Sequence, residues 1–154
     1  MPQPGYPLET MTFLHHRPEL TAEGAMVVLQ AAAAKARELS TPQCIAVVDR
    51  GGHLLVFQRM DGAKVLSQYS ATQKAATAAS SAAPSGELPE PLAAGLAAAT
   101  QGRFTNLRGG LPILVEGRVV GAIGVGSGTA EQDLIVAQAG IDALLASLDG
   151  REPG

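Results

Sequence analysis

The stretch IAVVDRGGHLLVFQRMDGA, residues 45–63, contains the strongest structural signal in this sequence. Its first four residues, Ile45–Val48, are apolar and mostly β-branched, which is typical of a buried strand. Gly51 and Gly52 can adopt the positive φ angles that a tight hairpin turn requires. From His53 onward the side chains alternate between two faces, as they do in a second strand. The stretch therefore predicts an antiparallel β-hairpin.

The hairpin ends in an abrupt corner, RMDGA, at residues 59–63. Arg59 and Asp61 place a cation and a carboxylate two positions apart where the strand stops, and Gly62 frees the backbone to turn. Such corners commonly face ligands, because a rigid sheet positions the polar side chains of its loops. A surface salt bridge on a loop explains the same spacing equally well, so the spacing alone leaves both interpretations open.

The rest of the chain supplies helices and further strands. Helical periodicity and end signals predict helices over residues 22–39, 64–81 and 92–100, and a fourth from Thr129 onward. Short apolar runs add strands over residues 104–107, 112–115 and 118–125. The order α-ββ-α-α-βββ-α predicts the α/β class in its α+β form, with a five-stranded antiparallel sheet packed with helices. Residues 20–150 would form one domain, preceded by an extended, proline-rich arm over residues 1–19.

The composition argues against several classes of partner. Aromatic residues make up only 3% of the chain and Trp is absent, so there are few ring faces on which single-stranded nucleic acid could stack. The formal net charge of −3 gives no basic footprint for a phosphate backbone. No apolar run approaches the roughly 20 residues that span a bilayer, and the N-terminus does not resemble a signal peptide. We therefore expect a cytoplasmic protein that binds neither nucleic acid nor membrane.

Metal-binding motifs are also missing. His15 and His16 are adjacent, so on a regular element they cannot both face one ion, and no HxxxH or CxxC motif supports them. The single cysteine, Cys44, opens an apolar strand, where a thiol usually packs as a small hydrophobic group. The sequence thus predicts no metal site and no required cofactor.

Four phrases occur in order along the chain: AVVDRGGHL at residues 46–54, RMDGA at 59–63, GGLPI at 109–113 and VVGAIGVGSGTAEQD at 119–133. With these phrases, residues 20–148 resemble the GlcG/HbpS family, also called the haem-degrading domain family. The resemblance implies a profilin-like arrangement of the sheet and helices. Members of this family are reported as haem binders, as small proteins of glycolate and diol operons, and as a cofactor-free lyase of aromatic hydroxylamines.

The residues that could contact a ligand lie at strand ends and on one helix face. Arginine suits this role because its planar guanidinium binds a carboxylate through two hydrogen bonds. A glycine pair can expose backbone N–H groups to a ligand. Lys74 lies in an alanine-rich helix at a position that the resemblance places near the cleft, although a solvated lysine fits the pattern as well. The predicted ligand-binding residues are Arg59, Met60, Gly62, Tyr69, Lys74, Arg103, Gly109 and Gly110.

Two functions fit these residues. The first is a binding module that holds a carboxylate-bearing planar ligand, either haem or an aromatic or hydroxy acid, in a cleft with a cationic rim. Haem also needs an axial ligand, for which the chain offers Met60, Tyr69 and the histidines of the arm. The predicted first helix, residues 22–39, lacks the histidine that the resemblance leads us to expect in haem-binding relatives.

The second function is a metal-independent carbon–nitrogen lyase of aromatic degradation. It would convert an aryl hydroxylamine such as 4-hydroxylaminobenzoate, together with one water that attacks the ring, to a dihydroxybenzoate and ammonia. This chemistry needs an acid for the departing oxygen and an arginine, Arg59 or Arg103, to hold the ring carboxylate. Asp61, Glu131 and His16 are the predicted catalytic residues. An accessory protein without turnover is a third interpretation, and the sequence slightly favours the binding module.

The arm and the alanine-faced helices offer more apolar surface than one domain of 154 residues needs to cover. Because family members assemble into higher oligomers, the resemblance points the same way. We therefore expect a homo-oligomer that takes a small molecule as its partner.

Overall fold

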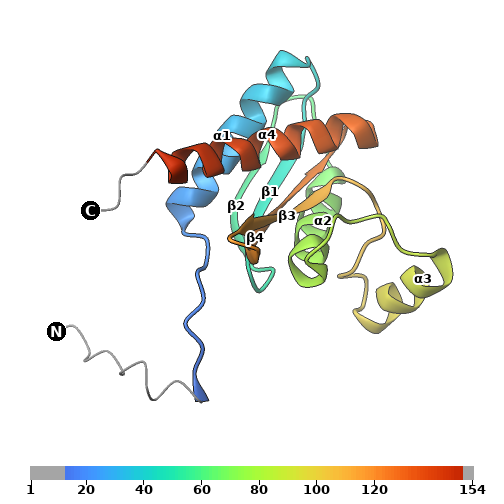
Figure 1. The fold of residues 1–154 in the computed structure, drawn as a ribbon. Coiled ribbons are helices and arrows are strands. Elements are labelled where there is room, and N and C mark those ends of the chain that lie inside the picture. The colour runs from blue at the N-terminus through green and yellow to red at the C-terminus, as the bar shows by residue number, and fades with distance from the viewer. Residues whose placement is uncertain (1–12, 151–154) are drawn as a thin grey trace.

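The computed structural model describes residues 13–150, which form four helices and one four-stranded sheet (Figure 1). The helices are α1 (Ala22–Glu38), α2 (Ser67–Ser81), α3 (Glu90–Ala99) and α4 (Ala130–Asp149). The strands are β1 (Cys44–Asp49), β2 (Leu54–Arg59), β3 (Gly110–Val115) and β4 (Arg118–Gly126). The predicted α+β class is confirmed, and every pair of neighbouring strands is antiparallel.

The sheet has the strand order β2-β1-β4-β3, with β1 and β4 at its centre. Cys44 pairs with both Arg59 and Gly126, so the start of β1 lies beside the ends of β2 and β4. This end of the sheet, where β1 starts and β2 and β4 finish, is termed end A. At the opposite end of the strands, termed end B, β4 begins and β1 leads into the turn toward β2.

Helices cover both faces of the sheet. Ile45 and Val47 of β1 pack in the core that α1 and α4 form on one face. Ala46 and Val48 pack against the alanines of α2 on the other face. A strand covered on both faces has a continuous apolar sequence, which explains why residues 44–48 show no polar alternation. In Figure 1, α1 and α4 lie together on one side of the sheet, and α3 lies to the side, beyond α2.

Side-chain caps begin α1 and α4. The Gly24 N–H donates to the hydroxyl oxygen of Thr21 at 3.0 Å. At α4, Thr129 and Gln132 form a reciprocal capping box: the Gln132 N–H donates to Thr129 Oγ1 at 3.2 Å, and the Thr129 N–H donates to Gln132 Oε1 at 2.9 Å. These bonds satisfy N–H groups that have no partner within the helix.

The predicted fifth strand, residues 104–107, is wrong. The chain between α3 and β3 has no regular structure, and polar side chains bond its backbone. The Thr105 N–H donates to Thr77 Oγ1 at 3.1 Å, and the Leu107 carbonyl oxygen accepts from Ser85 Oγ at 2.6 Å. These bonds satisfy backbone groups that would otherwise need a neighbouring strand.

Two helices begin at positions other than those predicted. α2 begins at Ser67 and not at residue 64, because a turn precedes it in which the Ser67 N–H donates to the Lys64 carbonyl oxygen. α3 begins at Glu90, two residues before its predicted start, because Pro91 is tolerated in the first turn of a helix.

The predicted arm, residues 1–19, lies partly outside the described residues. Residues 14–21 contain no helix or strand. Leu20 joins this segment to the sheet, since its N–H donates to the Val120 carbonyl oxygen at 2.9 Å. The division into arm and domain stays a prediction. Within residues 13–150, no helix is both long and apolar enough to cross a bilayer.

The backbone of α2 lies very close to β4. The inner face of α2 consists largely of alanines, among them Ala71 and Ala75, as the sequence predicts. A methyl group added at Gly124 of β4 would collide with the Ala71 carbonyl oxygen and lie 2.5 Å from the Ala75 nitrogen. Glycine is therefore the residue that fits at this position.

Replacing Gly124 with alanine should lower the free energy of unfolding by about 3 kcal/mol, because the added methyl group overpacks α2 against β4. The matched control is Gly95→Ala in α3, where an added carbon would meet nothing within 4 Å outside its own helix backbone. There alanine should raise stability by about 0.5–1 kcal/mol, since it removes the entropic cost of a helical glycine. Urea denaturation measures both changes. Equal effects of the two substitutions would contradict the close approach of α2.

Candidate functional site

The predicted ligand corner lies at end A and faces solvent. Arg59 and Asp61 are exposed, and Gly62 has a φ angle of +92°, as expected for a glycine turn. Met60 differs from them, because its side chain packs against the core and its N–H donates to the Gln43 carbonyl oxygen at 3.0 Å. The salt bridges found within residues 13–150 do not join Arg59 to Asp61, so the spacing does not produce the surface ion pair.

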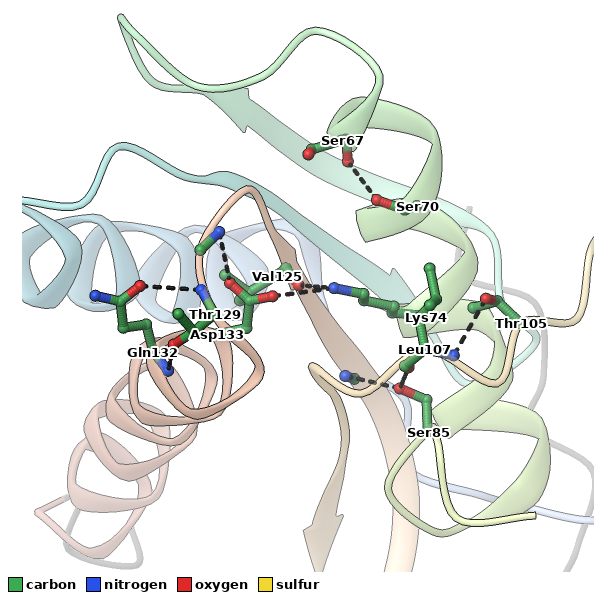
Figure 2. A network of polar contacts seen from close by, with 12 residues as sticks. Ser67, Ser70, Lys74, Ser85, Thr105, Leu107, Val125, Thr129, Gln132 and Asp133 are labelled. Carbon is green, nitrogen blue, oxygen red and sulfur yellow. Dashed lines mark hydrogen bonds and ion pairs between the residues drawn. The ribbon is translucent and has the colours of Figure 1, made fainter. Parts of the chain in front are cut away.

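Lys74 of α2 lies in a buried polar cluster at end A (Figure 2). Its side chain is 7% exposed, and its Nζ donates to the Val125 carbonyl oxygen at 2.8 Å and to Asp133 Oδ2 at 3.1 Å. Asp133 Oδ1 accepts from the Gly128 N–H at 3.0 Å. With its amide nitrogen turned toward this oxygen, the fully buried Gln43 donates to it at 2.8 Å. The interpretation of Lys74 as a solvated lysine is therefore wrong.

The predicted glycine pair belongs to the same cluster. Gly109 has a φ angle of +126°, and a methyl group there would lie 2.6 Å from the Val125 carbonyl oxygen and 3.0 Å from Lys74 Nζ. The Gly110 N–H donates to Ser85 Oγ at 2.9 Å. The structure thus brings Lys74, Gly109 and Gly110 together in one buried cluster.

Cys44, at the start of β1, is fully buried, as the sequence predicts. Burial raises the pKa of its thiol, and the Arg59 guanidinium acts in the opposite direction with a smaller effect. The thiol donates a weak hydrogen bond to the Lys64 carbonyl oxygen at 3.6 Å. A thiol in this state packs as an apolar group and is a poor nucleophile.

A hollow of about 690 Å³ at end B gathers positive charge. Its walls come from the segment before α1, the β1–β2 turn, the end of α2 and the start of β4. Three arginines and two histidines line it, and none of its described lining residues is acidic. This hollow is termed the cationic pocket, and its lining residues are His15, His16, Arg17, Pro18, Arg50, Gly51, Ala79, Ser80, Ala82, Arg118 and Val119.

Strand pairing brings the arginines of this pocket together. Asp49 of β1 pairs with Gly121 of β4, so the turn that follows β1 lies next to the start of β4. Arg50 and Arg118 therefore reach the same end of the sheet from two different hairpins. Neither arginine was expected from the sequence. Each of the two hairpin turns has an arginine beside it. If β1 and β4 are assumed to be antiparallel neighbours, this pattern places both arginines at the same end of the sheet.

Asp49 holds the β1–β2 turn beside the pocket. Its Oδ1 accepts from the N–H groups of Gly51 and His53, both at 2.9 Å, and lies 3.1 Å from Nδ1 of the His53 ring. Burial acts to raise the pKa of Asp49, but the hydrogen bonds from His53 and Gly51 and the charge of the His53 ring together lower it below its ordinary value. Asp49 is therefore a carboxylate at neutral pH.

The predicted catalytic residues do not meet at one place within a single chain. Asp61 and Glu131 are exposed near end A, whereas His16 lines the cationic pocket at end B. The nine residues of β4 separate these ends, and their eight intervals span roughly 26 Å at about 3.3 Å each. Acid–base catalysis needs its groups within hydrogen-bond reach of one substrate. Within one chain, this arrangement does not favour the lyase interpretation.

The remaining predicted ligand residues lie apart from the pocket. Tyr69 is exposed on the first turn of α2, near end A. Arg103 is exposed after α3, next to Gly102, whose carbonyl oxygen accepts from Gln73 Nε2 at 2.6 Å. Within residues 13–150, no group of three or more His, Cys, Asp or Glu side chains is arranged to hold a metal ion.

A family model described as "Haem degrading protein HbpS-like" matches residues 20–142. The chain belongs to this HbpS-like family. It is 38% identical over 128 residues to a 15.0 kDa protein of the dhaT-dhaS intergenic region of Citrobacter freundii, a match that covers 80% of this chain and 90% of the relative. It is 35% identical over 107 residues to the protein GlcG of Escherichia coli K12, covering 69% of this chain and 80% of GlcG. The GlcG/HbpS resemblance is thereby confirmed.

Solved structures support the same family. The crystal structure of HbpS has a TM-score of 0.75 and 35% sequence identity to this chain, and the match covers 90% of this chain and 96% of HbpS. The crystal structure of a complex of PduOC with haem has a TM-score of 0.74 and 29% identity, covering 81% of this chain and 94% of PduOC. The mixed fold with an antiparallel sheet is common to these proteins and this chain.

Replacing Lys74 with alanine should lower the free energy of unfolding by about 3–5 kcal/mol, because Asp133 would remain as a buried charge without its partner. Lys35→Ala is the matched control, since Lys35 pairs with Glu38 at 3.0 Å on the surface of α1, and such pairs contribute only about 0.3–0.5 kcal/mol. Thermal and urea denaturation measure both changes.

A double variant separates the ion pair from simple packing. Lys74→Met combined with Asp133→Leu removes both charges, so its loss of stability should be smaller than the sum of the two single losses. A loss equal to that sum would show that the two side chains stabilise the fold independently.

Proposed function

We propose that this chain is a small-molecule binding protein for a planar ligand that carries carboxylates, with haem as the leading ligand, and that the cationic pocket holds this ligand. The observation that carries the proposal is the gathering of three arginines and two histidines in one hollow whose described lining residues include no carboxylate. A pocket with this charge favours an anion of more than one charge, because each guanidinium can form paired hydrogen bonds with one carboxylate.

The dimensions and lining of the pocket support a ligand of this class. Its volume of about 690 Å³ falls within the roughly 300–1,000 Å³ typical of small-molecule sites. Ala79, Ala82 and Val119 give part of the lining an apolar character that suits a flat ring, while Arg17, Arg50 and Arg118 suit the carboxylates at its edge. Imidazole groups in the same region are among the side chains that bind haem iron. The residues of the pocket therefore fit haem.

The relatives support haem over other planar acids. The matching family is described by haem degradation, and PduOC, which has the same fold, has been crystallised in complex with haem. When bound, haem would supply iron for ligand binding or electron transfer. The arginines of the pocket would bind the carboxylates of haem, and its apolar side chains would contact the ring.

Haemin titration tests both the ligand and its position. Arg50→Ala and Arg118→Ala should each weaken haemin binding by about 1.5 kcal/mol, which is roughly tenfold in Kd, because each removes a charge-assisted hydrogen bond. The matched control is Arg37→Ala, an exposed arginine on α1 outside the pocket, which should leave the Kd unchanged.

Arg59→Ala distinguishes the cationic pocket from the RMDGA corner. If it weakens haemin binding while the Arg50 and Arg118 variants do not, the ligand binds at end A and the assignment to the pocket is wrong. If the wild-type chain does not bind haemin at all, haem is not its ligand.

We also propose that the chain forms a homo-oligomer. Three large apolar side chains are exposed within five residues at the start of α2: Val65 at 55%, Leu66 at 77% and Tyr69 at 62%. A cluster of this kind is typical of a protein–protein contact. Because a charge in such a contact opposes burial, Leu66→Lys should shift the mass in sedimentation toward that of a single chain of 15.7 kDa.

Ala34→Lys, on the exposed side of α1, is the control for this experiment and should leave the mass unchanged. A wild-type mass of one chain at micromolar concentration would refute the oligomer. An oligomer that survives Leu66→Lys would place the contact elsewhere on the surface.

A further inference from the structure

The β1–β2 turn holds an imidazole in a fixed orientation. Nδ1 of His53 lies 3.1 Å from Asp49 Oδ1 and 3.2 Å from Oδ2. The N–H groups of Gly51 and His53 hold the carboxylate in place, each at 2.9 Å. In the neutral ring this contact assigns the proton to Nδ1, so Nε2 keeps a free lone pair. The His53 side chain is 82% exposed, which leaves the ring accessible to a ligand.

This imidazole lies beside the wall of the cationic pocket. Gly51 lines the pocket, and a methyl group added to it would lie 2.9 Å from Cε1 and 3.0 Å from Nδ1 of His53. Arg50, in the same turn, also lines the pocket. One short turn therefore presents both a guanidinium for a carboxylate and an oriented imidazole next to it.

On the basis of the proposed function, we propose that His53 is the iron-binding residue for haem and that Asp49 is its positioning residue. Metal-binding histidines almost always donate their second ring N–H to a carboxylate, a backbone carbonyl or water, which fixes the ring and makes the other nitrogen a better donor to the metal. The Asp49–His53 pair has this arrangement already.

The other side chains that could bind iron lack either an orienting hydrogen bond or a position at end B. His15 and His16 line the pocket, but the ring hydrogen bonds found within residues 13–150 belong to His53. Met60 packs against the core, and Tyr69 is exposed on the first turn of α2, so neither lies at end B. α1 contains no histidine.

The test compares haemin with iron-free protoporphyrin IX, which has the same carboxylates but no metal, on the full chain. His53→Ala should weaken haemin binding roughly 10–100-fold and remove the absorption signature of imidazole-bound iron. Its affinity for protoporphyrin IX should equal that of the wild type, because the arginines remain. Free imidazole added to the His53→Ala variant should restore the signature.

Asp49→Asn tests the positioning role. Asparagine keeps an oxygen that can accept the N–H groups of the turn, but a neutral amide is a weaker acceptor for Nδ1–H than a carboxylate. His53 would then donate less charge to the iron, so haemin should stay bound and its reduction potential should rise. An unchanged potential would show that Asp49 only holds the turn, and would overturn its assigned role.

The outcomes separate this inference from the proposed function. If both porphyrins bind and the haemin spectrum is the same in the wild type and in His53→Ala, the inference alone is wrong. If His15→Ala or His16→Ala removes the signature and His53→Ala does not, the iron-binding residue lies in the segment before α1, and the inference is again wrong. If the wild type binds neither porphyrin, both the function and the inference are wrong.

Discussion

The structure at end A depends on the buried ion pair between Lys74 and Asp133. Two charges taken out of water must pair and must also complete their remaining hydrogen bonds, because an unpaired buried charge costs several kcal/mol. The lysine comes from α2 on one face of the sheet, and the aspartate comes from α4, which packs on the other face. Gly109 leaves room for the lysine, and Gly128 and Gln43 complete the hydrogen bonds of the aspartate. The ion pair thus joins directly two helical layers that the sheet would otherwise keep apart.

The charged groups of end B are arranged differently from those of end A. At end A opposite charges meet away from water, whereas at end B Arg17, Arg50 and Arg118 surround a hollow that none of the described acidic side chains lines. Like charges in a solvated hollow repel one another only weakly, because water and salt screen them. They become effective when a ligand with several negative charges displaces the water. At end A the buried polar groups are bonded to one another, whereas the salt bridges found within residues 13–150 do not include the arginines of end B. This contrast is the physical reason for proposing that the ligand binds at end B.

The local features of the fold could be predicted from the sequence, because short-range patterns determine them. The hairpin over residues 45–63, the caps at Thr21 and Thr129 and the alanine face of α2 are of this kind. Residues 104–107 have the composition of a strand, but their backbone forms hydrogen bonds with side chains of α2 and of the loop that follows it. The strand propensity of a segment contains no information about such distant partners. The burial of Lys74 depends on a partner 59 positions further along the chain, and the cationic pocket depends on the pairing of β1 with β4. Both are consequences of tertiary structure, which a single sequence does not reveal without the strand order.

The cationic pocket takes one wall from a segment that has no helix or strand of its own, residues 14–18. A ligand that bridges this wall to the sheet binds the folded chain and not the unfolded one, so by mass action it adds to the stability of the fold. A ligand at 100 times its Kd adds about 2.7 kcal/mol. A shift in melting temperature would therefore reveal even a colourless carboxylate in this pocket, and the amount of folded protein in a cell would rise and fall with the supply of its ligand.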